Sequence, residues 1–327
     1  MTANGGSRQD AAVPAAGIAE LGAEAHRAQQ SYGEGALVVC DRVVRIYTGA
    51  GIEVQALQGL DLLIGEGELV AMVGASGSGK STLMNILAGL DTPTAGRVRV
   101  AGMDLGALSA RERLSYRRHQ VGFVWQQASR NLLPYLTARQ NVIAPMWLSG
   151  MGRRERARRA TGLLDALGVA HCADRTPSRM SGGEQQRTAV ATALANGPRL
   201  LLADEPTGEL DRHTAQEVFA ALQTANSEFG ATVLVVTHDP AVSAQVRRTV
   251  AIRDGRTSSE TLHHDAADEL GNTVRHAVEY AVLDRAGRVQ LPREMLDQHQ
   301  MRDRVRLESA ADHIGVWPDR PAGDPRE

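Results

Sequence analysis

Three observations predict an α/β fold with a mixed sheet, a helical subdomain and a small β-rich C-terminal domain. Apolar, β-branched runs alternate with stretches in which apolar residues recur at helical spacing. One such run, residues 69–73, leads into a glycine-rich loop, and Leu83, Ile86, Leu87 and Leu90 then mark one face of a helix. From residue 278 onward, short strand patterns separated by turn residues replace this alternation.

The composition of the chain limits the classes of protein to which it can belong. The chain has 327 residues, 43% of them hydrophobic, and a net charge of −2, which suits one large domain plus a smaller one without general attraction to nucleic acid. Cys40 and Cys172 are far apart and form no C-x-x-C pair, so neither a disulfide framework nor a zinc site is indicated. There is no apolar run of roughly 18 residues and no signal-peptide pattern. We expect a cytoplasmic protein that serves a membrane only through a separate partner chain.

The glycine-rich loop is the first candidate site. Its glycines let backbone N–H groups surround a phosphate, and the positive end of the following helix adds a partial charge. We expect Lys80 to reach the β- and γ-phosphates of a nucleotide and Ser81 to hold Mg²⁺. Lys80 is the only lysine in the chain, which favours a role that needs a compact ammonium rather than a planar guanidinium. The loop residues are Gly74, Ala75, Ser76, Gly77, Ser78, Gly79, Lys80, Ser81 and Thr82.

Polar residues follow two other apolar runs. Asp204 and Glu205 follow residues 200–203, and His238 follows residues 231–237. Because functional groups gather at the carboxyl ends of parallel strands, we expect all three to face the phosphate loop. Asp204 would hold the Mg²⁺ shell, Glu205 would polarise an attacking water, and His238 would contact the γ-phosphate or that water. A packing role is the alternative for the histidine.

A second glycine turn opens another helix. Ser181 is suited to the N-cap position, and the free N–H groups behind it form a second anion site with Gly182, Gly183 and Gln185. Only the first anion site has a lysine, so the simplest interpretation is that the second completes a nucleotide bound by another molecule. Ahead of the phosphate loop, Tyr47 is a candidate platform for base stacking, with core packing as the alternative. Residues 121–125 predict a strand that delivers Gln126.

Taken together, these motifs resemble the ATP-binding cassette ATPases, in order and spacing, over about residues 36–257. The resemblance implies a head-to-tail dimer that hydrolyses MgATP, with each ATP between the phosphate loop of one copy and the Ser181 turn of the other. It implies that Tyr47 stacks on adenine, that Glu205 is the general base and that His238 is a switch. Asp211 would couple the two subunits. The implied Mg²⁺ ligands are Ser81, Gln126 and Asp204, and Gln126 would also sense the membrane partner.

The sequence resembles one branch of that family more than the others. Residues 85–91, 121–126 and 131–138 resemble the ATPases that work with lipoprotein-release, macrolide-efflux and antimicrobial-peptide-resistance permeases. Met180, Thr192 and Glu209 depart from the usual pattern without removing a catalytic group. The favoured hypothesis is therefore the ATPase subunit of a transporter or mechanotransmission complex, attached to the inner face of the cell membrane through a permease. A soluble regulator in which ATP gates DNA binding is the alternative, and a translation or repair factor of the same family is third.

The expected domain boundaries lie where the amino-acid composition changes. Residues 1–35 are expected to be a disordered tail with a short helix at 18–30, and the ATPase domain covers 36–257, with a helical subdomain at about 127–178. Its arginine run at 153–159 is expected to be a solvated helix face rather than a nucleic-acid site. Polar residues 258–277 are expected to be a linker, whose residues 263–265 are a weaker candidate metal site, and residues 321–327 a tail.

Residues 278–320 carry a different pattern. The spacing Asp284-x-x-Gly-Arg-Val-x-Leu-Pro resembles the swapped-hairpin domains of bacterial transition-state regulators and antitoxins, which dimerise and often bind DNA. Strands are expected at 278–283, 289–291, 305–307 and 314–317, with a short helix from Pro292. Seven arginines against eight acids leave no basic excess, so dimerisation or regulation is favoured over DNA binding.

Overall fold

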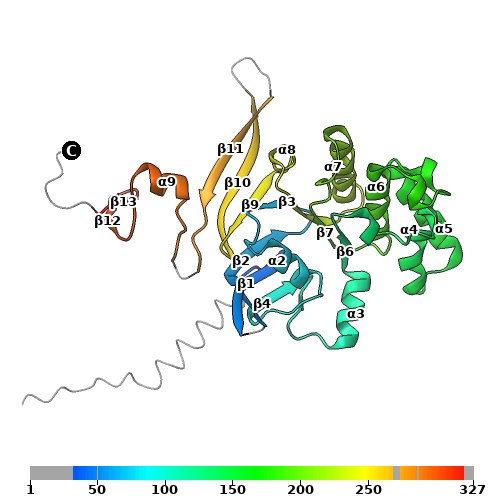
Figure 1. The fold of residues 1–327 in the computed structure, drawn as a ribbon, viewed down its shortest axis with the longest axis horizontal. Helices are drawn as coiled ribbons and strands as arrows, with labels where there is room; N and C mark the ends of the chain where they lie inside the picture. The colour runs from blue at the N-terminus through cyan, green and yellow to red at the C-terminus, as the bar shows by residue number, and fades with distance from the viewer. Residues whose placement is uncertain (1–31, 50, 268–272, 286, 320–327) are drawn as a thin grey trace, which may run out of the picture.

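The computed structural model describes residues 32–49, 51–267, 273–285 and 287–319, and Figure 1 shows their arrangement. The expected tails and the helix at 18–30 therefore lie largely outside the described residues. The described residues form two larger sheets, a two-stranded sheet and a group of helices, and the C-terminal elements lie beyond the seven-stranded sheet in Figure 1.

The larger sheet has seven strands in the order β11-β10-β9-β3-β8-β7-β6. Its strands β6, β7, β8, β3 and β9 are parallel, and β10 and β11 extend it as an antiparallel hairpin. The bounds are β3 Leu69–Val73, β6 Val121–Val124, β7 Leu200–Asp204, β8 Thr232–Val236, β9 Arg248–Arg253, β10 Arg256–Ala267 and β11 Thr273–Ala281.

Both faces of the parallel part are buried, which explains why its strands are apolar without alternation. In β7, Leu201 and Ala203 belong to one hydrophobic cluster, whereas Leu200 and Leu202 belong to the other. The first cluster lies under the helices α4 to α7, and the second lies against α2 and the smaller sheet.

The smaller sheet is antiparallel, with the order β2-β1-β4-β5. Strand β1 runs without a break from Ala36 to Gly49, with register shifts around Val43 and Val44. The bounds are β1 Ala36–Gly49, β2 Ile52–Gly65, β4 Ala95–Val100 and β5 Met103–Asp104.

The helices begin at local signals that the sequence carries. Capping boxes start α3 at Ser109, α4 at Thr137 and α6 at Ser181, and in each the side chain accepts a backbone N–H three residues on. Helices α4 and α5, with short 3₁₀ turns at 128–130, 170–172 and 177–179, occupy the expected helical subdomain. The helix bounds are α2 Lys80–Leu87, α3 Ala110–His119, α4 Ala138–Leu148, α5 Arg153–Ala166, α6 Gly182–Ala193, α7 Arg212–Ser227 and α8 Pro240–Ser243.

The expected linker at 258–277 is corrected by the structure. Described residues of this stretch lie in β10 and β11, which pair from Ser259 with Ala281 to Ala267 with Thr273. The composition suggested a solvated linker because it is polar, but backbone hydrogen bonds to an existing sheet edge do not require apolar side chains on both faces.

The C-terminal elements largely follow the sequence prediction. Helix α9 spans Arg293–Gln298, and β12 Val305–Ser309 pairs with β13 Ile314–Pro318 as a two-stranded sheet. The strand expected at 289–291 is only a single bridge between Val289 and Leu283.

Candidate functional site

The phosphate loop and the acidic pair lie at the same edge of the larger sheet. Met72 of β3 and Asp204 of β7 both pair with Val236 of β8, one from each side. The parallel strands therefore end at one level, and the loop that begins at Gly74 lies two strands from Asp204 and next to the end of β8. The sheet register thus brings together residues 74–82, 204–205 and 238, as the sequence predicts.

The phosphate loop closes around its lysine. The Lys80 ammonium donates hydrogen bonds to the carbonyl oxygens of Gly74 and Ala75 at 2.8 Å each, and lies 3.4 Å from Ser78 Oγ. Gly79 has φ 104°, and a Cβ there would lie 2.5 Å from the carbonyl oxygen of Ala56, so only glycine fits. The buried ammonium is consequently held at the N-terminus of α2, where the helix dipole also favours an anion.

The acids lie where β7 ends. Glu205 takes a left-handed backbone conformation, φ 44°, which turns the chain directly after Asp204. Burial and the neighbouring charge of Glu205 raise the pKa of Asp204, and the Lys80 ammonium opposes this shift. His238 Nδ1 lies 3.4 Å from Glu205 Oε2, so the expected base and switch residues are in contact.

Gln126 reaches the same place from β6. A Cβ built on Gly208 would lie 3.0 Å from Gln126 Nε2 and 3.5 Å from Glu205 Oε2, which places both side chains beside this glycine. Ser81, Gln126 and Asp204 would offer a cation oxygen ligands, which are the ligands that Mg²⁺ prefers. The raised pKa of Asp204 fits a cation at this position, because a buried carboxylate beside a second acid is stabilised by positive charge.

A hydrogen bond that the sequence did not reveal links this edge of the sheet to helix α6. Gln186 Nε2 donates to the Trp125 carbonyl oxygen at 2.9 Å, which joins the strand end before Gln126 to the second glycine turn. The signal was weak, because Gln186 is one of two adjacent glutamines in a polar stretch. A cavity of about 280 Å³ lies between these segments and is lined by Gln126, Gln127, Gly182, Gln185 and Glu209 among others.

The second glycine turn is exposed at the start of α6. Ser181 and Gly182 are exposed, Gly183 is buried, and Gln185 Nε2 donates to the Met180 carbonyl oxygen at 3.1 Å. A Cβ on Gly183 would lie 2.2 Å from Thr214 Cγ2, so this glycine allows α6 to pack against α7. The turn is thus open to another molecule on one side and packed on the other.

Asp211 is used locally, as the N-cap of α7. Its Oδ1 accepts the N–H groups of His213 and Thr214 at 3.0 and 3.1 Å, and its Oδ2 accepts the Thr214 hydroxyl at 2.6 Å. These hydrogen bonds lower the pKa of Asp211. Within the chain, therefore, the carboxylate shapes the start of α7 rather than reaching the phosphate loop.

Tyr47 lies near the end of β1 and is 38% exposed. Its hydroxyl donates to Asp91 Oδ2 at 2.8 Å, and the Arg45 guanidinium lies 4.4 Å from the ring centroid. Arg45 also pairs with Asp91 at 2.8 Å. The sequence did not reveal this support, because Asp91 is 44 residues away from Tyr47.

The phosphate loop lies between the parallel strand β3 and helix α2, and the two acids lie at the end of β7, on the other side of β8. This arrangement defines a P-loop nucleotide-binding protein. The ABC transporter family profile matches residues 57–208. The ATP-binding cassette MJ0796 has been solved as a dimer in a post-hydrolysis state, bound to ADP and phosphate. It is 40% identical, is 97% covered by this chain, and superposes on 68% of it with a TM-score of 0.62. The chain belongs to the ATP-binding cassette family.

Curated relatives agree with this assignment. The macrolide export ATP-binding/permease protein MacB of Chromobacterium violaceum is 48% identical over 221 residues, which are 68% of this chain and 34% of that protein. MacB of Shigella flexneri is 48% identical over 211 residues. The chain thus spans about a third of the length of these relatives. In the part of the chain that the structure describes, no helix has both the length and the apolar character needed to cross a bilayer.

Proposed function

We propose that this chain binds and hydrolyses MgATP as a head-to-tail dimer and drives a separate membrane permease. One observation carries the proposal: Met72 and Asp204 share Val236 as a register partner, so the lysine loop and the acidic pair lie at one edge of the sheet. Ser81, Gln126 and Asp204 would hold Mg²⁺, which would shield charge on the phosphates. Tyr47 would stack on the adenine from the end of β1.

In this proposal Glu205 accepts a proton from the attacking water, and His238 orients that water. The backbone turns at Glu205 in a left-handed conformation, and the 3.4 Å contact with His238 Nδ1 holds the two side chains together. Lys80 would stabilise negative charge that develops on the transferred phosphate oxygens.

The exposed Ser181 turn supports the dimer. A helix start presents N–H groups without intrahelical partners, and this one is exposed at Ser181 and Gly182. Because it has no lysine, it would complete a site whose lysine belongs to a second copy. The dimeric solved relative and the permease-fused relatives give the same assembly and partner by analogy.

Substitution of the base tests the proposal. We expect Glu205→Gln to lower the steady-state ATPase rate by about 10²-fold or more while ATP binding persists, because the variant keeps the site's shape but accepts no proton. Combined with Ile314→Glu, which removes the C-terminal pairing proposed below, the variant should also form an ATP-dependent dimer in size-exclusion chromatography with light scattering. Glu228→Gln, on an acid at the far end of α7, is the matched control. Undiminished hydrolysis by Glu205→Gln would refute the assignment of the base.

We also propose that the C-terminal elements pair with those of a second copy, as in swapped-hairpin domains. The two-stranded sheet of β12 and β13 exposes apolar side chains, and such a sheet is marginally stable alone. We expect Ile314→Glu to shift the nucleotide-free chain from dimer to monomer, whereas the neighbouring His313→Glu does not. A nucleotide-free chain that is monomeric without any substitution contradicts this proposal. Sequence-independent, salt-sensitive binding of duplex DNA would favour the regulator instead.

A further inference from the structure

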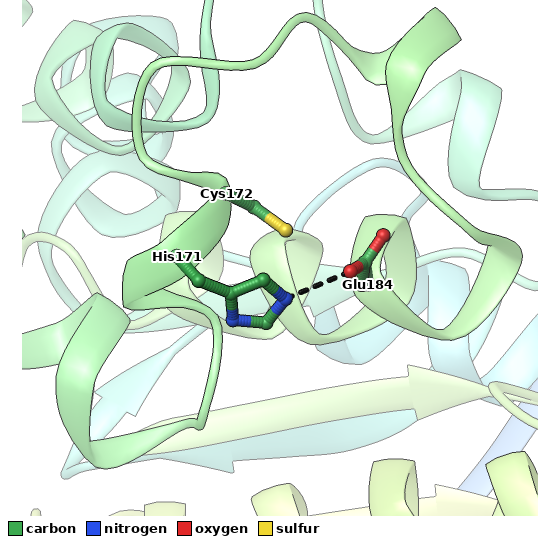
Figure 2. Close-up of side chains that lie close together, drawn as sticks. All are labelled: His171, Cys172 and Glu184. Carbon is green, nitrogen blue, oxygen red and sulfur yellow. Dashed lines mark hydrogen bonds and ion pairs between the residues drawn. The ribbon is translucent and has the colours of Figure 1, made fainter.

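Three metal-binding side chains meet beside the exposed glycine turn, outside the nucleotide site. His171 and Cys172 come from the 3₁₀ turn at 170–172, and Glu184 comes from the first turn of α6. One ligand atom of each residue lies within 4.8 Å of the other two. Figure 2 shows the imidazole and the thiol directed at the carboxylate from the same segment.

A hydrogen bond already joins two of the three groups. His171 Nε2 lies 2.8 Å from Glu184 Oε1, and the Cys172 thiol lies within 4.8 Å of both ligand atoms. Glu184 Oε2 accepts the Ser181 N–H at 2.7 Å, so the second oxygen is used in the cap of α6. A metal bound at Oε1 therefore leaves the helix cap intact.

We propose that His171, Cys172 and Glu184 form a site for a thiophilic divalent metal of the Zn²⁺ class, with solvent as the fourth ligand. Thiolate, imidazole and carboxylate are the ligands of tetrahedral zinc sites. Mg²⁺ is not expected here, because it prefers oxygen ligands and octahedral geometry. The site is thus chemically separate from the one proposed for MgATP.

The geometry needs only small movements. Metal–ligand bonds of about 2.0–2.3 Å in a tetrahedron separate ligand atoms by about 3.3–3.8 Å. The three atoms are within 4.8 Å of one another, with nitrogen and oxygen at 2.8 Å, so shifts of about an ångström suffice. His171 is 54% exposed at its side chain, which gives an ion a path from solvent to the buried thiol.

The Arg175 guanidinium competes for this position. Arg175 Nη1 lies 3.8 Å from both Cys172 Sγ and Glu184 Oε1. Its side chain is 48% exposed, so the guanidinium is free to turn toward solvent when a metal binds. The metal would then tie the 3₁₀ turn at 170–172 to the start of α6 and restrict the movement of Ser181 and Gly182.

Cobalt titration of the full-length, chelator-stripped, nucleotide-free chain tests the site. We expect one Co²⁺ per chain, with a thiolate charge-transfer band in the near ultraviolet and the visible bands of tetrahedral cobalt, all displaced by Zn²⁺. Cys172→Ser should abolish the charge-transfer band. His171→Asn should weaken binding by at least about tenfold, by analogy with the loss seen when supporting groups of metal sites are removed.

Cys40→Ser is the matched control, because Cys40 is also a buried free thiol but lies in β1. Absence of the charge-transfer band in the unmodified chain, or its persistence in Cys172→Ser, overturns the proposal. If Cys172→Ser fails to melt cooperatively, His171→Asn decides, since its exposed ring is not needed for packing. Unchanged cobalt affinity in that variant also overturns the proposal. No step of this test involves ATP, so its result is independent of the proposed ATPase.

Discussion

The lone lysine offers the most direct test of the nucleotide site. Lys80 donates to two carbonyl oxygens at 2.8 Å and lies 3.4 Å from Ser78 Oγ, so its ammonium occupies a fixed place among the loop oxygens. A bound triphosphate would receive at least one charge-assisted hydrogen bond from it. Such a bond contributes about 1.5–3 kcal/mol, which corresponds to about a 10- to 150-fold change in affinity.

We therefore expect Lys80→Ala to raise the Kd for MgATP by about 10- to 150-fold, measured by isothermal titration or with a fluorescent ATP analogue. Lys80→Arg should fail to restore binding, because a planar guanidinium does not fit the space that a buried ammonium fills. Arg154→Ala, which removes an exposed cation from α5, is the control for net charge. An unchanged Kd in Lys80→Ala, or full binding by Lys80→Arg, would refute the reasoning.

Two further predictions concern stability. Burial and the charge of Glu205 raise the pKa of Asp204 in the folded chain above its ordinary value of 3.8. The folded chain therefore loses stability as the pH rises from 3.8 to this higher pKa. Asp204→Asn should consequently raise the melting temperature of the chelator-treated, nucleotide-free chain at pH 7 but not below pH 3.8, and equal melting at pH 7 would contradict this. Asp211→Ala should lower the melting temperature because it removes three hydrogen bonds at the start of α7. Asp211→Asn should lower the melting temperature less, because an asparagine side chain also caps a helix. If both Asp211 variants melt like the parent chain, the cap has no effect on stability.

The polar hairpin shows where sequence reasoning failed. Residues 258–277 were expected to be a linker because their side chains are polar, yet Ser259 and Glu260 pair in register with both β9 and β11. Side-chain composition reports burial, whereas strand pairing at a sheet edge depends on the backbone and on a neighbouring strand. The pairing partners of this segment are not encoded in its own pattern.

Contacts across long separations were equally hidden. Tyr47 and Asp91, or His171 and Glu184, are joined only when β1, the 3₁₀ turn and α6 take their places. The thiol of Cys172 likewise gave no metal signal in the sequence, because its partners do not follow the spacing of known metal-binding motifs.

The sequence by itself determined the local units: the strand, glycine loop and helix around Lys80, the capped start of α6 at Ser181, and the acids that end β7. These units depend on periodicity, capping and glycine conformations, which act within a few residues. The sequence also predicted that the loop and the acids share one edge, but only the tertiary structure decided the strand order and register, in which Met72 and Asp204 lie on either side of Val236. The physical reason is that register and strand order arise from packing between distant segments, which no short stretch specifies.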